Sequence, residues 1–425
     1  MFQFPKIREL SFLVYGLSLT GISVIKFFKN NEIKNFKVWD DHQKKIFNNY
    51  RTKNLNKTLN QVDYIVLSPG ISLIKNKKLK RFKKKIITDI DLFYLTNKSN
   101  KTIVVTGTNG KSTTCKLLAH LLEKNKFPCS LGGNIGTPIL SIKNKKKNYV
   151  IIEASSFQLA HSKFICPNYA FFLNLSVDHL DWHGSKLNYL NSKLKIFSLQ
   201  TAKHYAVVNK NFKRIFNKKK FLSRLIVNKK TDYFKLKHKI KNGYLTSIIN
   251  DENMSFVYRF AKLLKITDKS FIDSMTSFKG LAHRFEIFLK KGKTIFINDS
   301  KATSFKSTQY ALSSLKNIYW ILGGLEKKGD KIKLSNLKKN IIKSYIIGKN
   351  TSFFENQLKG KIDFSVTRDL KNSIIQISKE INFKKNLPKS ILLSPAAASF
   401  DQFDNFEERG KEFKRLCKKN VGKFI

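Results

Sequence analysis

The feature that most constrains this chain is an apolar run that breaks into a glycine-containing turn, followed by a lysine and a row of hydroxyl residues. The stretch reads VVTGTNGKSTT and covers residues 104–114. We expect a buried strand at 102–105 and a helix with one apolar face at 112–124. In that order, backbone N–H groups and the N-terminus of the helix converge on one point, which suits a phosphate group.

Side chains of the same stretch suit nucleotide binding. Lys111 would place a positive charge on the outer phosphates, and the hydroxyl of Ser112 or Thr113 would be a magnesium ligand. The usual phosphate loop has a glycine five residues before its Gly-Lys pair, where this chain has Val105. The alternative is an ordinary turn between a strand and a helix. The glycines, lysine and hydroxyls in this order favour nucleotide binding.

Length and charge limit the class of protein. A chain of 425 residues has room for more than one domain, and 41% hydrophobic and 12% aromatic residues are typical of a globular protein. The formal net charge of +53 raises nucleic acid or an anionic membrane as a partner. The basic residues are mostly lysines scattered over the whole length. We therefore expect no nucleic-acid partner, and a basic nucleic-acid-binding protein is the weaker alternative.

The cysteines and the N-terminus indicate the compartment. Four cysteines lie far apart with no CxxC pair, which argues against a zinc ribbon and for a reducing compartment. The apolar run at 10–28 suggests a signal peptide or a membrane span, but Gly16, Gly21 and several hydroxyl residues interrupt it. We therefore expect a strand, a turn and a helix there, a cytoplasmic protein, and no membrane insertion.

Repeated strand-then-turn units predict a small parallel α/β domain at the N-terminus. The strand 11–15 and its glycine turn are followed by strands at 36–39 and 64–67, which run into Asp40 and into a Ser-Pro-Gly-Ile segment. Ligands of such domains bind at the carboxyl ends of the strands. The alternative is an α/β domain whose turns need glycine for geometry alone.

The central part places an acid beside the phosphate loop. Gly132-Gly133-Asn134-Ile135-Gly136 is expected to be a flexible turn, and a strand at 149–152 then ends in Glu153. An acid at the carboxyl end of a strand beside a phosphate loop can hold magnesium directly or through water. The alternative is an acid that starts a helix, and the neighbouring loop favours the metal.

Two histidines follow the next apolar strand, which is expected at 170–175. His179 and His183 are four residues apart, a spacing that suits zinc on a helix. A zinc protease would need a glutamate at the position of Leu180. We therefore expect a loop that carries one ligand for a second hard cation, with a surface histidine as the alternative.

Three basic residues farther along give weaker signals. A helix expected at 188–200 carries Lys193 and Lys195, which by themselves would be solvent-exposed lysines. Arg284 could reach a nucleotide phosphate or pair with Glu286, and the spacing does not choose between them.

The last third repeats the α/β pattern. Strands are expected at 294–297, 317–322, 344–347 and 390–393. Each ends in small or polar residues, so their loops would share one edge of a parallel sheet. Hydroxyls, Lys301 and Lys327 at that edge suit an anionic carboxylate ligand, and the alternative is a sheet edge with ordinary loops.

The whole set of motifs resembles the Mur ligase family, over nearly all of the chain. The motifs that carry the resemblance, in the family's order, are GLSLTG, SPGIS, GTNGKSTT, GGNIGTP, EASSFQL, NLSVDHLDWH, HRFE, NDSKATS, LGGLEKKGD and LLSPAAASFDQFDNFEERG. The central loop fits any Mur ligase or the related folylpolyglutamate synthase. The N-terminal loop and the two C-terminal blocks are similar to those of the member that adds D-glutamate.

The resemblance implies an α/β fold of three domains. A Rossmann-like domain at 1–93 would bind the UDP end of the substrate, and a P-loop ATPase-like domain at 94–280 would bind ATP. A second Rossmann-like domain at 281–425 would bind the amino acid and close over it. The protein is expected to be a monomer.

The resemblance also implies a ligase of peptidoglycan precursor synthesis. ATP would phosphorylate the carboxylate of UDP-N-acetylmuramoyl-L-alanine, the amine of D-glutamate would attack the acyl phosphate, and phosphate would leave. This chemistry needs cations and dipoles near the transferring oxygens and no protein nucleophile. Another Mur-type ligase or a folylpolyglutamate synthase is the alternative.

Site residues are carried over by motif. For ATP the resemblance implies Gly107, Thr108, Asn109, Gly110, Lys111, Ser112, Thr113, Asn250, Asn253, Arg284 and Asp299. For two Mg²⁺ sites it implies Ser112 with Glu153, and His179 with Lys193 carbamylated by carbon dioxide. The catalytic residues would be Lys111, Glu153, His179 and Lys193. The nucleotide substrate would meet Ser18, Leu19, Thr20, Gly21, Asp40, Ser68, Pro69, Gly70, Ile71, Asn134 and Ser155. D-Glutamate would meet Lys301, Thr303, Lys327, Ser399 and Phe406.

The chain departs from the family's pattern at four places. Ser18 stands where glycine is usual, Asp41-His42 replaces a Thr-Arg pair by the uracil, Ile249 replaces a histidine, and Leu325-Glu326 alters the loop before Lys327. The first two affect the uridine contacts. None removes a group that the phosphoryl chemistry needs.

Overall fold

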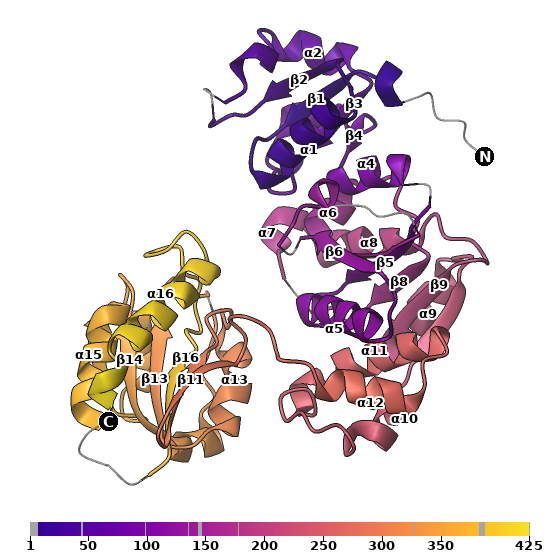
Figure 1. Ribbon diagram of the computed structural model, residues 1–425. Coiled ribbons are helices and arrows are strands. Elements are labelled where there is room, and N and C mark those ends of the chain that lie inside the picture. The colour runs from indigo at the N-terminus through magenta and orange to yellow at the C-terminus, as the bar shows by residue number, and fades with distance from the viewer. Residues whose placement is uncertain are drawn as a thin grey trace. The chain divides into compact units, whose positions relative to one another are not determined.

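The computed structural model describes residues 7–43, 46–97, 99–134, 136–142, 147–176, 178–327, 329–381 and 387–424. It divides into two compact units, residues 1–278 and 279–425 (Figure 1). Three residues of the predicted motifs, Ile135, Val177 and Lys328, lie outside the described residues. The predicted division into three domains stays a prediction, while each of the three parts contains its own sheet.

The first sheet of the first unit is parallel and has the order β2-β1-β3-β4. Its elements are β1 (Phe12–Tyr15), α1 (Leu19–Asn30), β2 (Phe36–Trp39), α2 (Leu55–Gln61), β3 (Tyr64–Leu67), α3 (Lys77–Lys80), β4 (Ile86–Ile87) and α4 (Asp89–Thr96). All four residues of β1 are buried because it is paired on both edges and apolar on both faces. The predicted strand, turn and helix at 11–28 are confirmed.

The second sheet is also parallel, with the order β10-β9-β8-β5-β7-β6. Its strands are β5 (Lys101–Thr106), β6 (Cys129–Gly133), β7 (Tyr149–Glu153), β8 (Tyr169–Phe172), β9 (Tyr205–Asn209) and β10 (Arg224–Asn228). Its helices are α5 (Lys111–Lys124), α6 (Ser156–His161), α7 (Leu180–His183), α8 (Lys186–Leu194), α9 (Lys213–Lys218), α10 (Lys230–Lys237), α11 (Asp251–Leu263) and α12 (Asp268–Thr276). The strand and helix predicted around the phosphate loop are confirmed.

Three predictions in this sheet need correction. Gly132 and Gly133 end the edge strand β6 and are not part of a flexible turn, because they pair with the end of β7. Strand β8 ends at Phe172, before the predicted 175, and helix α8 gives way to a 3₁₀ turn at Lys195. The sequence analysis predicted no strand between residues 201 and 241 and so missed β9 and the partly buried edge strand β10.

The second unit has one sheet with the order β11-β12-β16-β13-β14-β15, in which only β11 is antiparallel. Its strands are β11 (Glu286–Lys291), β12 (Thr294–Asn298), β13 (Ile318–Gly323), β14 (Ile341–Ile347), β15 (Phe364–Arg368) and β16 (Lys389–Leu393). Its helices are α13 (Phe305–Ser314), α14 (Ser352–Leu358), α15 (Leu370–Ile381) and α16 (Phe406–Lys419). The four predicted strands are confirmed as parallel neighbours, and the sequence signals missed β11 and β15.

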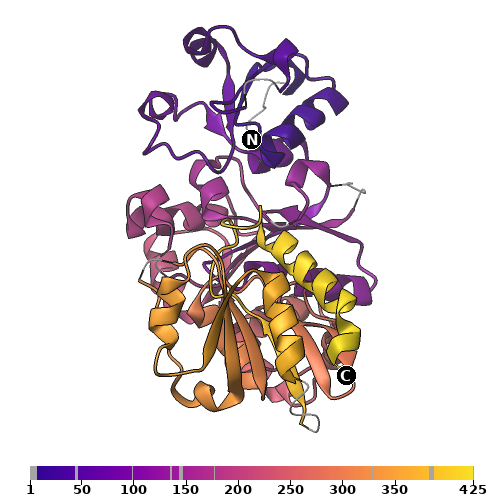
Figure 2. The same ribbon diagram turned by 90° about the vertical axis from the view of Figure 1, so that its left-hand side faces the viewer.

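Helices cover both faces of this sheet (Figures 1 and 2). Side chains of α13 and α14 share one apolar core with the strands, and side chains of α15 and α16 share the other. The α/β fold class with parallel sheets is therefore confirmed in both units. Among the helices that the structure describes, none combines the length and the apolar character that a membrane span requires.

Candidate active site

The phosphate loop lies between β5 and α5, at the carboxyl edge of the second sheet. Gly110 is the residue before α5 and has φ +83°, a conformation that L side chains rarely adopt. A Cβ at Gly110 would also collide with Asn253 Oδ1. Asn253 can therefore lie this close to the N-terminus of α5 only because residue 110 is a glycine.

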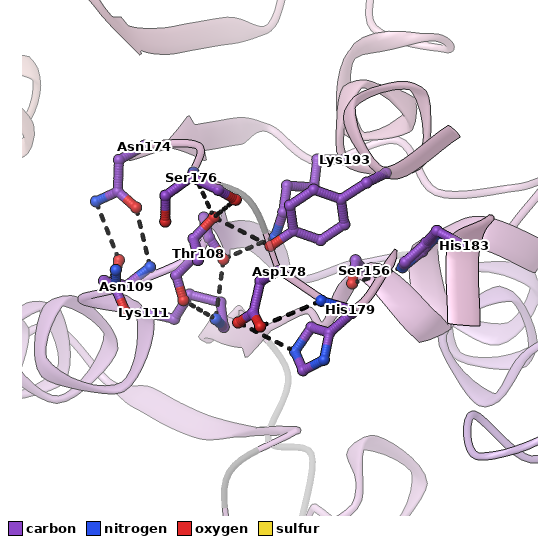
Figure 3. Close-up of polar contacts among 12 residues, drawn as sticks. Thr108, Asn109, Lys111, Ser156, Asn174, Ser176, Asp178, His179, His183 and Lys193 are labelled. Atoms are coloured by element: carbon purple, nitrogen blue, oxygen red, sulfur yellow. Dashed lines mark hydrogen bonds and ion pairs between the residues drawn. The ribbon is translucent and has the colours of Figure 1, made fainter. Parts of the chain in front are cut away.

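Neighbouring segments hold the loop in one conformation (Figure 3). Asn109 N donates to Asn174 Oδ1 (2.9 Å), and Asn174 Nδ2 donates back to Asn109 O (3.2 Å). The hydroxyls of Thr108 and Tyr189 lie 3.0 Å apart, and Ser176 N donates to Thr108 Oγ1 (3.0 Å). Such a preformed loop does not need to be ordered when a phosphate binds.

Lys111 lies over its own loop. Its Nζ donates to Gly107 O and to Thr108 O, both at 2.9 Å. The ammonium group is thus held at the concave side of the turn, beside the N-terminus of α5. Both groups favour an anion at this position.

Asn250 and Asn253, predicted for the ATP site, connect to this loop. Asn253 Nδ2 donates to Asn250 Oδ1 (3.1 Å), and Thr114 Oγ1 donates to Asn253 Oδ1 (3.3 Å). Asn250 Nδ2 donates to Tyr244 O (2.9 Å). The structure therefore brings both asparagines to the start of α5.

Glu153 ends β7, the strand next to β5, and is 2% exposed. Asn134 Nδ2 donates to its Oε1 (3.1 Å), whereas its Oε2 is buried and has no hydrogen-bond partner among the described residues. A buried carboxylate oxygen without a donor is destabilised unless a cation or water meets it. Glu153 therefore fits the predicted magnesium ligand. Asn134 is placed beside it.

Lys193 corrects the expectation of a solvent-exposed lysine, since only 1% of it is exposed. It lies on the face of α8 that turns toward the phosphate loop, where its Nζ donates to Gly107 O (2.7 Å) and lies 4.7 Å from the centre of the Tyr189 ring (Figure 3). Burial, helped by the neighbouring charge of Lys111, lowers the pKa of Lys193 to about 6. At neutral pH this side chain is therefore mostly an uncharged amine.

Lys195 is not a solvent lysine either. Its Nζ donates to Ala160 O (2.6 Å) and Ser162 O (3.2 Å), so it satisfies the last carbonyls of α6. Burial lowers the pKa of Lys195 to about 8. Its contacts are structural, and only Lys193 reaches the phosphate loop.

The two histidines have different surroundings. His179 precedes α7 with φ 52°, is about half exposed, and its Nε2 lies 3.5 Å from Asp178 Oδ2. His183 is buried, and its Nε2 lies 3.0 Å from Ser156 Oγ. His183 is thus engaged by a hydroxyl and does not face a common zinc with His179. Among the described residues, no three His, Cys, Asp or Glu side chains gather as a metal site.

The predicted nucleotide-substrate residues of the first sheet meet at the ends of β1, β2 and β3. Ser68 Oγ donates to Gly16 O (2.8 Å), and Asp40 Oδ2 accepts from Leu17 N (2.6 Å). These bonds hold the turn before α1, which ends at Ser18; Leu19, Thr20 and Gly21 are the first residues of the helix. Ser155, predicted for the same substrate, caps α6 in a reciprocal arrangement with Gln158.

The second unit gathers its predicted residues on loops at one sheet edge. Lys301 Nζ lies 4.6 Å from the centre of the Phe406 ring, and the hydroxyl of Ser399 is buried with no hydrogen-bond partner among the described residues. Leu325, in the loop of Lys327, exchanges backbone hydrogen bonds of 2.9 Å with Ala398. Thr303 and Lys327 are exposed.

Asp299 and Arg284 lie at the base of these loops. Asp299 is buried, accepts from Phe285 N (3.1 Å) and from Ser394 Oγ (2.7 Å), and burial raises its pKa to about 7. Arg284 Nε is buried without a partner among the described residues, while Glu286 pairs with Lys414 at 2.6 Å. The alternative pairing of Arg284 with Glu286 is therefore not observed.

Comparison with known proteins agrees with this arrangement. The Mur ligase middle domain family matches residues 105–275, which span the phosphate loop, Glu153 and Lys193. A UDP-N-acetylmuramoylalanine–D-glutamate ligase of Rickettsia prowazekii is 35% identical over 96% of this chain and 97% of its own. A protein of the same name from a Wolbachia of Brugia malayi is 33% identical over 98% of each chain.

This chain belongs to the Mur ligase family. The fold agrees as well: the MurF ligase of Thermotoga maritima, solved in complex with ADP, aligns with a TM-score of 0.56 at 16% identity over 99% of this chain and 100% of that chain. At that identity the structural likeness concerns the fold alone.

Sequence reasoning missed several groups that shape this Mur ligase site. Tyr189, Asn174 and Glu252 brace the phosphate loop, Glu252 by accepting from Asn174 Nδ2 (2.9 Å). Asn174 is the first residue of the motif NLSVDHLDWH, so its place near the site could have been predicted. Glu252 is far from the loop in sequence, and no spacing signals its contact.

Proposed function

We propose that this chain is an ATP-dependent ligase that joins D-glutamate to UDP-N-acetylmuramoyl-L-alanine through an acyl phosphate, in peptidoglycan precursor synthesis. Its similarity to ligases of that name over almost its whole length supports the substrates. The structural observation that carries the phosphoryl chemistry is the buried, unpartnered oxygen of Glu153 beside a preformed phosphate loop.

In the first step, the substrate carboxylate attacks the terminal phosphate of ATP, and ADP leaves. The loop N–H groups and Lys111 would hold the phosphates, with Asn250, Asn253, Arg284 and Asp299 around the nucleotide. Bound Mg²⁺ would neutralise charge on the transferring oxygens. Ser112 and Glu153 would hold one ion, and His179 and Lys193 a second one.

Lys193 would serve as a ligand only after modification. Its uncharged amine would attack carbon dioxide, forming an N–C bond and releasing one proton, which leaves a carbamate anion. The lowered pKa supplies the free amine at neutral pH, and the buried position beside Gly107 would direct the new anion toward the phosphates. The carbamate and the two metal sites are part of the proposal.

In the second step, the amine of D-glutamate attacks the acyl carbon, loses a proton, and phosphate leaves. Lys301, Thr303, Lys327, Ser399 and Phe406 would hold the amino acid, and the two lysines suit its carboxylates. Asn134 and Ser155 would position the muramoyl part, and the loops at Ser18 to Gly21, Asp40 and Ser68 to Ile71 the uridine. No protein nucleophile takes part.

The test is phosphate release from ATP with UDP-N-acetylmuramoyl-L-alanine and a panel of amino acids. We expect release that depends on D-glutamate and not on other amino acids. Clear use of another amino acid would contradict the specificity, and turnover of a pteroate would indicate a folylpolyglutamate synthase instead. Salt-dependent DNA binding without ATP turnover would indicate a nucleic-acid-binding protein. A cytoplasmic monomer remains the expectation.

A further inference from the structure

Arg409 lies on the first turns of α16 and is a buried cation in the second unit. It is not among the site residues that the resemblance implies. Only 1% of it is exposed. Its Nε donates to Ser300 Oγ (3.0 Å), and its Nη2 donates to Ser300 O (2.8 Å) and Ala397 O (2.9 Å). The Ser300 hydroxyl in turn donates to Phe406 O (2.8 Å).

These bonds tie together the loops that carry the proposed D-glutamate residues. Ser300 precedes Lys301 and lies on the loop of Thr303, Ala397 lies on the loop of Ser399, and Phe406 is itself one of the set. The third loop also meets Arg409, because a Cβ on Gly324 would lie 3.2 Å from its Nη1. Gly324 opens the loop of Lys327. One guanidinium therefore bonds to the loops of Lys301 and Ser399 and lies close to the loop of Lys327.

The charge of Arg409 is not balanced by a hydrogen-bonded acid. Among the described residues its hydrogen-bond partners are carbonyl and hydroxyl oxygens, and its Nη1 is buried with no such partner. Asp401 is near enough to favour the charged form but makes no hydrogen bond to it among the described residues. Since Asp401 compensates this charge only from a distance, the guanidinium leaves positive potential at the sheet edge.

We propose that Arg409 is a positioning residue of the ligase: it assembles the amino-acid loops, and its unbalanced charge favours a substrate with an additional carboxylate. The inference rests on the proposed function. The planar fork donates in several directions at once, which a lysine cannot reproduce. Loss of the fork should therefore disturb amino-acid capture more than ATP use.

The experiment compares Arg409→Met and Arg409→Lys with Arg415→Met in the full-length protein. Arg415 is a matched control, because it lies on the same helix but is exposed, and within the described part of the chain it pairs only with Glu412 at i,i+3. For each variant, KM is measured for D-glutamate, ATP and UDP-N-acetylmuramoyl-L-alanine. Acyl phosphate formed without D-glutamate is trapped with hydroxylamine, and circular dichroism reports folding.

We expect Arg409→Met to raise KM for D-glutamate about 100-fold and Arg409→Lys about tenfold, with less than about threefold change in the other two constants. Hydroxamate should still form, and Arg415→Met should behave as wild type. Equal changes in all three constants, no change, or unfolding of both Arg409 variants would overturn the inference. If wild type itself does not use D-glutamate, the proposed function fails instead.

Discussion

Lys193 and Arg409 are buried basic side chains in different units, and their comparison shows how the type of basic residue suits the chemistry. Each is 1% exposed, and each donates only to carbonyl or hydroxyl oxygens among the described residues. An amine can lose its proton and react, whereas a guanidinium stays charged. Lys193 lies where the proposed chemistry needs a modifiable group, and Arg409 lies where it needs a lasting positive charge.

The pKa values express the same difference. Burial and Lys111 lower the pKa of Lys193 to about 6, below neutral pH. Burial lowers the pKa of Arg409 to about 10, which still leaves it protonated in any ordinary buffer. The pKa of Lys193 falls further, from 10.5 to about 6, because the charge of Lys111 adds to burial, whereas Asp401 opposes the effect of burial on Arg409. The amine is therefore neutralised at neutral pH and the guanidinium is not.

The largest expected effect tests whether Lys193 acts as an anion. Lys193→Ala should lower kcat about 100-fold to 1000-fold, because the proposed carbamate ligand is lost. Formate or acetate should partly restore activity by entering the vacated space. The measurement is phosphate release at increasing carboxylate concentration.

Two further variants control this experiment. Lys193→Arg keeps a cation but cannot form the carbamate, so it should be as inactive as the alanine variant and should not respond to carboxylates. Lys186→Ala, an exposed position on the same helix, should match wild type. Full activity of Lys193→Ala or Lys193→Arg would remove the carbamate from the mechanism.

Two glycine substitutions, one near each of these side chains, should each raise one KM about tenfold and so distinguish the two regions. In the phosphate loop, the new Cβ of Gly110→Ala would collide with Asn253 of α11. Beside Arg409, the new Cβ of Gly324→Ala would collide with Ala398 O. Both glycines also have positive φ, which strains an alanine. We expect the first to raise KM for ATP and the second KM for D-glutamate. Exposed Gly360, also at positive φ and with no atom near a new Cβ, supplies the control Gly360→Ala. The same KM rising in both variants would break the separation.

The last comparison concerns the pH dependence of stability. Between pH 6 and its unfolded value near 10.4, Lys193 binds a proton in the unfolded chain but not in the folded one, so wild-type stability rises with pH by at most about 1.4 kcal/mol per unit. The advantage of Lys193→Met over wild type should therefore be largest at pH 6 and shrink toward pH 9. Urea unfolding in buffers free of carbon dioxide measures it.

Arg409→Met provides the contrast in the same experiment. Arg409 stays protonated in both states from pH 6 to pH 9, so the change in free energy of unfolding should be constant over that range. A pH-independent difference for Lys193→Met would mean that Lys193 is charged in the folded protein. That result would remove the contrast between the two cations.

Much of the fold could be predicted because its signals are local. The phosphate loop, the strands β1, β3, β7 and β16, and the acid at the end of β7 follow from apolar runs broken by glycine, hydroxyl or acidic residues. Edge strand β10 was missed because its apolar run, residues 225–227, is only three residues long. The roles of His179 and Lys193 came from family resemblance and not from spacing.

The sequence by itself determined the α/β class, the phosphate loop and the order of the motifs, since these depend on residues that are neighbours along the chain. Only the tertiary structure decided that Lys193 is buried against Gly107, that Glu153 keeps one oxygen without a donor, and that Arg409 joins distant loops. Burial and hydrogen-bond satisfaction depend on segments far apart in sequence, which is why residue type and spacing cannot supply them.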